Sequence, residues 1–121
     1  MYHKTIDSIP QNILSAVKAN LETIENFDYN IFDLDDLLDK QTITHLSLEI
    51  FRKLNIFEEG ILKEDKYINF IKEITDGYDR NVTYHNDLHA ADVLQTSYVI
   101  IQKGFLKTVN KINHRNFNCK R

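Results

Sequence analysis

Residues 84–95 read Tyr-His-Asn-Asp-Leu-His-Ala-Ala-Asp-Val-Leu-Gln, and they open an apolar pattern of helical period that runs to about residue 104. His85 and His89 are four positions apart, and side chains at this spacing lie on one face of a helix. Two such imidazoles can converge on one site, where a neutral ring can bind a metal ion and a charged ring can donate a proton. Taken without its neighbours, the pair is better explained as two solvated residues at a helix start.

The helix predicted over 86–104 separates apolar from polar side chains. Its apolar face carries Leu88, Ala91, Leu94, Tyr98, Ile101 and Phe105. His89, Asp92 and Thr96 fall toward another face. A binding site needs polar groups that are not buried in the core, so this separation favours a site at the start of the helix.

The rest of the chain also shows helical spacing of its apolar residues. Ser8 is a candidate N-cap of the first helix, with Pro10 in its first turn. Further helices are predicted at 34–38, from residue 42 to near 55, and from residue 64 to Gly77 as the C′ residue. No stretch alternates like a strand over a useful length. We therefore expect an all-α protein, a compact helical bundle.

Composition is that of a folding chain, because 42% of the 121 residues are hydrophobic and 11% are aromatic. The net charge of −3 conceals an asymmetry: residues 103–121 hold six bases and no acid, whereas the rest holds nine bases and eighteen acids. A basic tail can contact nucleic acid. A solvated chain end explains this one more simply, and we expect no nucleic-acid partner.

The sequence also bears on location. It has no run of about 18 apolar residues, so no transmembrane segment is expected. The first residues lack the apolar core of a secretory signal. The one cysteine, Cys119, cannot form an internal disulfide, which suits a reducing compartment. We expect a cytoplasmic protein, with peripheral membrane association left open.

The stretch 84–95 resembles the Tyr-His-Asn-x-x-His-Ala-Ala-Asp-Val signature of the class I 3′,5′-cyclic-nucleotide phosphodiesterases. Residues 26–34, with the pattern Asn-Phe-Asp…Ile-Phe-x-Leu, resemble an element near the start of the catalytic domain in that family. The likeness extends over roughly residues 24–104. It divides the chain into an N-terminal helical part of a phosphodiesterase catalytic domain, 1–106, and a basic, Asn-rich tail, 107–121.

The resemblance implies hydrolysis of cAMP and/or cGMP to 5′-nucleoside monophosphates in signal transduction. It places His85 at the position of the proton donor, and His89 at that of a metal ligand. Tyr84 and Asn86 would flank the substrate. Asp92, three residues after His89, could orient an imidazole. A plain surface carboxylate is an equal alternative for Asp92.

The complete enzymes of this family use two divalent metal ions, Zn with Mg or Mn, and take other ligands from a later His-Asp pair and a later Asp. A catalytic zinc ion usually has three protein ligands. After residue 101 the one histidine is His114, and Arg115 follows it. We therefore expect an incomplete metal site and little activity from these 121 residues alone. The alternative is a non-catalytic helical fragment that pairs with a full-length relative or with itself.

Two further groups of polar residues have plainer interpretations. His45 lies inside a predicted helix, and we expect it to be a partly buried surface residue. The acidic cluster Asp33, Asp35, Asp36 and Asp39 lacks the glycine and the final glutamate of a calcium-binding loop. We interpret this cluster as a solvated acidic turn.

Overall fold

The computed structural model describes residues 9–83 and 86–105. Ser8, Tyr84, His85 and the tail 107–121 lie outside them. The described elements are α2 (Gln11–Leu21), α3 (Ile31–Leu38), the 3₁₀ turn η1 (Asp39–Gln41), α4 (Thr42–Lys53), α5 (Glu64–Asp76), α6 (Asp87–Ile100) and the π-helical turn η2 (Ile101–Phe105). No strand occurs among the described residues. The all-α prediction is confirmed.

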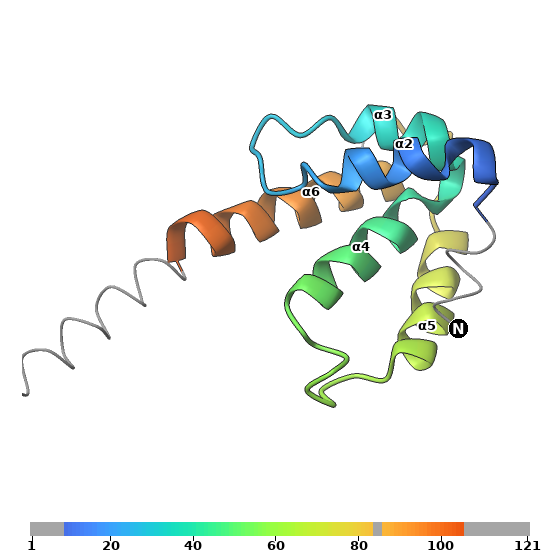
Figure 1. Cartoon of the computed structure of the whole chain (residues 1–121). Coiled ribbons are helices and arrows are strands. Elements are labelled where there is room, and N and C mark those ends of the chain that lie inside the picture. Colours follow the sequence, from blue (N-terminus) through green and yellow to red (C-terminus); the bar gives the residue numbers. More distant parts are fainter. Residues whose placement is uncertain (1–8, 84–85, 106–121) are drawn as a thin grey trace, which may run out of the picture.

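Helix α4 lies at the centre of the described fold (Figure 1). It packs against α6 on one side and α5 on the other, while α2 lies beside α3. Each helix contributes fully or almost fully buried side chains to one continuous core, among them Val17, Leu34, Leu46, Ile68, Ala91 and Tyr98. This burial of apolar surface is the main stabilising contribution to a fold of this kind.

The helix ends follow local hydrogen bonding. Asn30 is the N-cap of α3, and its Oδ1 accepts hydrogen bonds from the backbone N–H groups of Phe32, at 3.0 Å, and Asp33, at 3.2 Å. The helix therefore starts at Ile31, earlier than the predicted segment 34–38. Helix α2 begins at Gln11, directly after Pro10. Gly77 is the C-cap of α5 with φ −78°, so it is one position closer to the helix than the predicted C′ residue.

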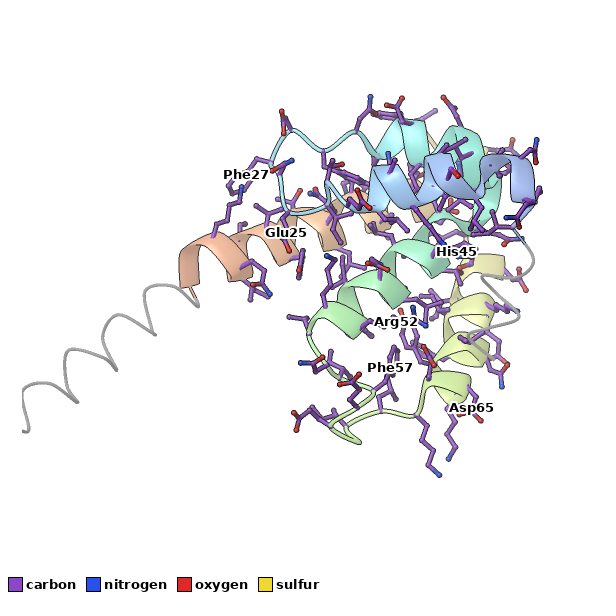
Figure 2. The ribbon with its side chains drawn as sticks, viewed as in Figure 1. Glu25, Phe27, His45, Arg52, Phe57 and Asp65 are labelled. Carbon is purple, nitrogen blue, oxygen red and sulfur yellow. The ribbon has the colours of Figure 1, made fainter. Side chains whose placement is uncertain are left out.

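The prediction for His45 is wrong, because its side chain is buried, with 1% exposed. Polar residues of the first turns of α4 are covered as fully as apolar ones, since helices pack on several sides of α4. His45 lies on these turns (Figure 2). Its Nε2 is 3.4 Å from Oε1 of Gln41. Burial, with a contribution from the charge of Lys72, lowers the pKa of His45 to about 4.

Among the described helices, none combines the length and apolar character that crossing a bilayer requires.

Candidate functional site at the start of α6

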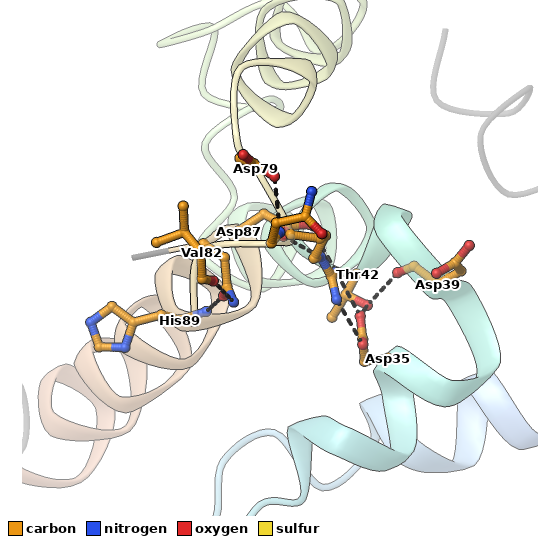
Figure 3. A network of polar contacts seen from close by, with 10 residues as sticks. Asp35, Asp39, Thr42, Asp79, Val82, Asp87 and His89 are labelled. Atoms are coloured by element: carbon orange, nitrogen blue, oxygen red, sulfur yellow. Dashed lines mark hydrogen bonds and ion pairs between the residues drawn. The ribbon is translucent and has the colours of Figure 1, made fainter. Parts of the chain in front are cut away.

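Asn86 determines where α6 begins. Its Oδ1 accepts a hydrogen bond from the backbone N–H of His89 at 3.0 Å, which makes it the N-cap. Its Nδ2 donates to the carbonyl oxygen of Val82 at 3.1 Å. The same side chain thus holds the first turn of the helix and the segment that leads into it. Figure 3 shows these contacts beside the ring of His89.

A hollow of about 190 Å³ lies between α3 and the start of α6. One wall is formed by Ile31 and Phe32 of α3, and the other residues that line it are Thr83, Asn86, Leu88, His89 and Asp92. Asn86 and His89 are half-buried, whereas Asp92 is exposed. The structure therefore brings three of the five predicted site residues to one hollow. Tyr84 and His85 lie outside the described residues.

A larger hollow, of about 550 Å³, lies between α2 and α3. Polar residues such as Asn20, Tyr29 and Asp33 line it, and no histidine does. Size alone would favour this hollow, but none of the described residues of the stretch 84–95 lines it. We therefore place the candidate site at the smaller hollow, which holds His89.

The described residues contain no group of three histidine, cysteine, aspartate or glutamate side chains that could hold a metal ion. At the hollow, His89 and Asp92 supply one imidazole and one carboxylate. A catalytic zinc ion usually takes three protein ligands. The described part of the chain therefore does not fit a metal ion by itself.

A partly buried ion-pair network lies at the start of α6 (Figure 3). Nη1 and Nη2 of Arg80 donate to Oδ2 and Oδ1 of Asp35 at 3.0 and 2.9 Å. Nη2 also donates to Oδ2 of Asp87 at 2.9 Å, and Nε of Arg80 forms an ion pair with Oδ1 of Asp87. Asp87 is the first residue of α6, and its side chain is 2% exposed.

The network shifts the ionisation of its members. Burial disfavours the charged form of Asp35, but hydrogen bonds from Arg80 and from Thr42, whose Oγ1 lies 2.7 Å from Oδ1 of Asp35, outweigh it and lower the pKa of Asp35. Hydrogen bonds to Asp35 and Asp87 raise the pKa of Arg80. The interpretation of Asp35 as part of a solvated turn is therefore wrong. It lies in α3 and forms ion pairs with a residue 45 positions away.

The faces of α6 differ in part from the prediction. Ala91 and Tyr98 are buried as expected, and Asp92 and Thr96 are exposed. Ile101, predicted on the core face, is 39% exposed. Val99 and Gln95, which were not predicted on the core face, are buried. Helix α6 packs against α4.

Comparison with known proteins gives the relationship. The chain is 34% identical over 92 residues, 74% of its length, to 3′,5′-cyclic-AMP phosphodiesterase 4 of Dictyostelium discoideum. It is 32% identical over 76 residues, 63% of its length, to the high affinity cAMP-specific and IBMX-insensitive 3′,5′-cyclic phosphodiesterase 8 of Drosophila melanogaster. The chain is related to the 3′,5′-cyclic-nucleotide phosphodiesterases.

A third phosphodiesterase relative, from Caenorhabditis elegans, carries the name "probable 3′,5′-cyclic-AMP phosphodiesterase pde-4" and is 24% identical over 98 residues, 81% of this chain. The matched segments cover 9%, 8% and 14% of the Dictyostelium, Drosophila and Caenorhabditis proteins, so the chain spans a small part of each phosphodiesterase. No family model matches the chain. No solved structure matches it either.

Sequence reasoning missed that Arg80, Asp35 and Asp87 come together beside the candidate site. Arg80 lies in the connection between α5 and α6, so no helical spacing relates it to Asp35 or Asp87.

Proposed function

We propose that this chain takes part in the hydrolysis of 3′,5′-cyclic nucleotides, cAMP and/or cGMP, to 5′-nucleoside monophosphates in signal transduction. Residues 1–106 would form the N-terminal helical part of a phosphodiesterase catalytic domain, with 107–121 as a separate basic tail. The observation that carries the proposal is that His89, Asn86 and Asp92 line one hollow at the start of α6. The names of the relatives favour cAMP as the substrate.

Each residue of the matched stretch has a distinct role in this proposal. His85 is the general acid that protonates the O3′ leaving group, a contribution of about 10²–10⁴ in rate. His89 would be one ligand of a divalent metal site, which Zn with Mg or Mn would occupy in the complete enzyme. Such a metal ion would lower the pKa of a bound water toward about 7.

The remaining residues bind and orient. Asn86, which lines the hollow, and Tyr84 contact the substrate. Asn86 also accepts the hydrogen bond from the backbone N–H of His89, so the residue that contacts substrate also orders the turn that carries the metal ligand. Asp92, which lines the same hollow one helical turn after His89, orients an imidazole by accepting its N–H.

We further infer that these 121 residues alone hydrolyse cAMP very slowly, because the described part offers no set of three metal ligands. The single cysteine supports a cytoplasmic location. The direct test is co-expression with the part of the Dictyostelium relative that follows the segment matched here. This assembly is assayed for cAMP hydrolysis with Mg²⁺, Mn²⁺ or Zn²⁺.

The expected result is hydrolysis by the assembly, little by the chain alone, and loss on His89→Ala. Thr96→Ala is the matched control, because Thr96 is an exposed residue further along the same helix. Retention of full activity by His89→Ala contradicts the assigned role. An assembly that forms but hydrolyses no cyclic nucleotide contradicts the proposed function.

A second candidate function is a non-catalytic fragment that pairs with a full-length phosphodiesterase. The observation that favours it is the outer face of α6, where Val93 is 50% exposed and Ile100, two turns later, is 52% exposed. Exposed apolar residues that share a helix face are typical of interaction surfaces. Size-exclusion chromatography with the full-length Dictyostelium relative tests this function.

Co-elution that Val93→Lys and Ile100→Lys abolish would support the pairing. The control is Ile61→Lys, which changes a side chain 73% exposed in the connection between α4 and α5. A chain that elutes as a monomer, binds no hydrophobic dye and does not co-elute with the relative argues against this function. It also argues against a homodimer.

A further inference from the structure

Arg80 and Asp87 stand at the two ends of the segment that carries Tyr84 and His85. Their side chains are joined by a hydrogen bond of 2.9 Å from Nη2 to Oδ2 and by the ion pair between Nε and Oδ1. The two-point contact therefore ties residue 80, in the connection after α5, to the first residue of α6.

The guanidinium of Arg80 also contacts α3, the helix that forms the opposite wall of the hollow. Asp35 bonds it from α3 at 2.9 and 3.0 Å, and α3 also provides Phe32 to the hollow. Thr42, the first residue of α4, in turn contacts Asp35. Arg80 thus connects the wall formed by α3 to the helix start that carries His89.

The geometry of this contact is well defined because both partners of Arg80 meet it with two oxygens. A guanidinium is planar and its donors form a rigid fork, so paired carboxylate contacts fix its orientation as well as its position. Asp87 is 2% exposed, Asp35 18% and Arg80 25%. Of the three side chains, Asp87 is therefore the most shielded from water.

We propose that Arg80 is a positioning residue of the candidate site. Through Asp87 it fixes the first turn of α6, and through Asp35 it sets that turn against α3, so that His89 keeps its placement at the hollow. The proposal rests on the proposed function in so far as it concerns catalysis. The part of the proposal that concerns the placement of the first turn of α6 can be tested on the isolated chain.

A second bridging pair offers a matched control. Nε and Nη2 of Arg52 both contact Oε1 of Glu64, at 3.2 and 3.3 Å, with side chains 34% and 30% exposed. This pair joins the end of α4, where Figure 2 labels Arg52, to the start of α5. Neither residue lines the hollow. Arg52→Gln therefore also removes an arginine that bridges two helices, but away from the site.

The first experiment measures amide hydrogen exchange by NMR in the full 121-residue chain. In Arg80→Gln, the amides of His89 and Ala90 are expected to exchange about ten-fold faster relative to Leu46 and Leu48 in α4. Arg80→Lys, which keeps the charge but not the fork, gives an intermediate effect, and Arg52→Gln gives none at these amides. Asp87→Asn is the second variant if Arg80→Gln does not fold.

The second experiment measures kcat and KM in the co-expressed assembly described above. Misplacement of a catalytic group by about 1 Å can cost about a hundred-fold in rate. Arg80→Gln is expected to lower kcat by at least about ten-fold with little change in KM, with partial recovery in Arg80→Lys. Arg52→Gln retains the kcat of the unmodified assembly.

The outcomes separate this inference from the proposed function. If the unmodified assembly is active and Arg80→Gln keeps its kcat, the positioning role is overturned while the proposed function stands. If the assembly is inactive, the proposed function fails. Hydrogen exchange in the isolated chain then tests the positioning role of Arg80. Unchanged relative exchange at His89 and Ala90 in the Arg80 and Asp87 variants overturns the inference by itself.

Discussion

Gln95 of α6 donates a hydrogen bond from Nε2 to the carbonyl oxygen of Ile24 at 2.9 Å, although the two residues are 71 positions apart. The same Nε2 donates to the carbonyl oxygen of Asn26, also at 2.9 Å. Gln95 is 2% exposed and Ile24 is fully buried. One buried amide therefore satisfies two carbonyl groups in the connection that follows α2 and joins that connection to α6.

Replacing Gln95 by leucine is expected to destabilise the chain by about 2 kcal/mol. The substitution leaves carbonyl groups without a donor, and buried unpaired polar groups are costly. Urea unfolding followed by circular dichroism measures the change in the free energy of unfolding. Gln11→Leu, at an exposed position on α2, is the control and should change stability by a few tenths of a kcal/mol. Equal effects of the two substitutions would show that the buried amide has no special role.

His45 should make stability fall as the pH decreases from about 6.5 toward about 4. Burial lowers its pKa from an ordinary value of 6.5 to about 4 in the folded state. The unfolded chain therefore binds more protons across this window, and acid favours unfolding, by about 3 kcal/mol at most. The measurement is the free energy of unfolding in urea at pH 7, 6, 5 and 4.

The matched variant for this window is His45→Gln, which cannot gain a proton. The free energy of unfolding of this variant should change less with pH between 6.5 and 4, whatever its value at pH 7. His3→Gln removes a histidine near the N-terminus and serves as the control. A pH dependence that persists unchanged in His45→Gln would falsify the assignment.

Asp35 acts in a lower pH window. Hydrogen bonds from Arg80 and Thr42 exceed the effect of burial and lower its pKa below the ordinary 3.8, so its contribution to stability is complete above pH 3.8 and is lost as the pH falls below it. Asp35→Asn should lower stability at pH 7 and reduce the further loss between pH 4 and 2. Asp36→Asn, at an exposed position beside it, is the control. A parallel acid profile in Asp35→Asn and the unmodified chain contradicts the prediction.

The helices could be predicted because they follow from local spacing, but the environment of single polar residues could not. Leu46 and Tyr98 lie on apolar stripes that the sequence displays directly. His45 is buried because helices cover α4 on several sides, which is a property of the packing. Asp35 and Arg80 are distant in sequence, and an isolated charge in a sequence most often belongs to the surface. The ion-pair network beside the candidate site therefore became visible only in three dimensions.

Asn86 and Asn30 allow the structural and functional roles of a helix cap to be separated. Each caps a helix that borders the hollow, and each accepts a hydrogen bond from a backbone N–H at 3.0 Å. Replacing either by alanine should cost about 1 kcal/mol of stability. Thermal unfolding and chemical denaturation measure this common effect.

The two alanine variants should differ in the co-expressed assembly with the Dictyostelium relative. Asn86 lines the hollow, binds the backbone N–H of His89 and contacts Val82, whereas Asn30 caps α3 from outside the hollow. We expect Asn86→Ala to lower kcat/KM for cAMP by about ten-fold or more, because it disturbs both the proposed substrate contact and the turn that carries His89. Asn30→Ala should stay within about two-fold once assays are run well below its unfolding temperature, since it changes stability without changing that turn. Equal kcat/KM values for the two variants would mean that Asn86 acts as a helix cap alone.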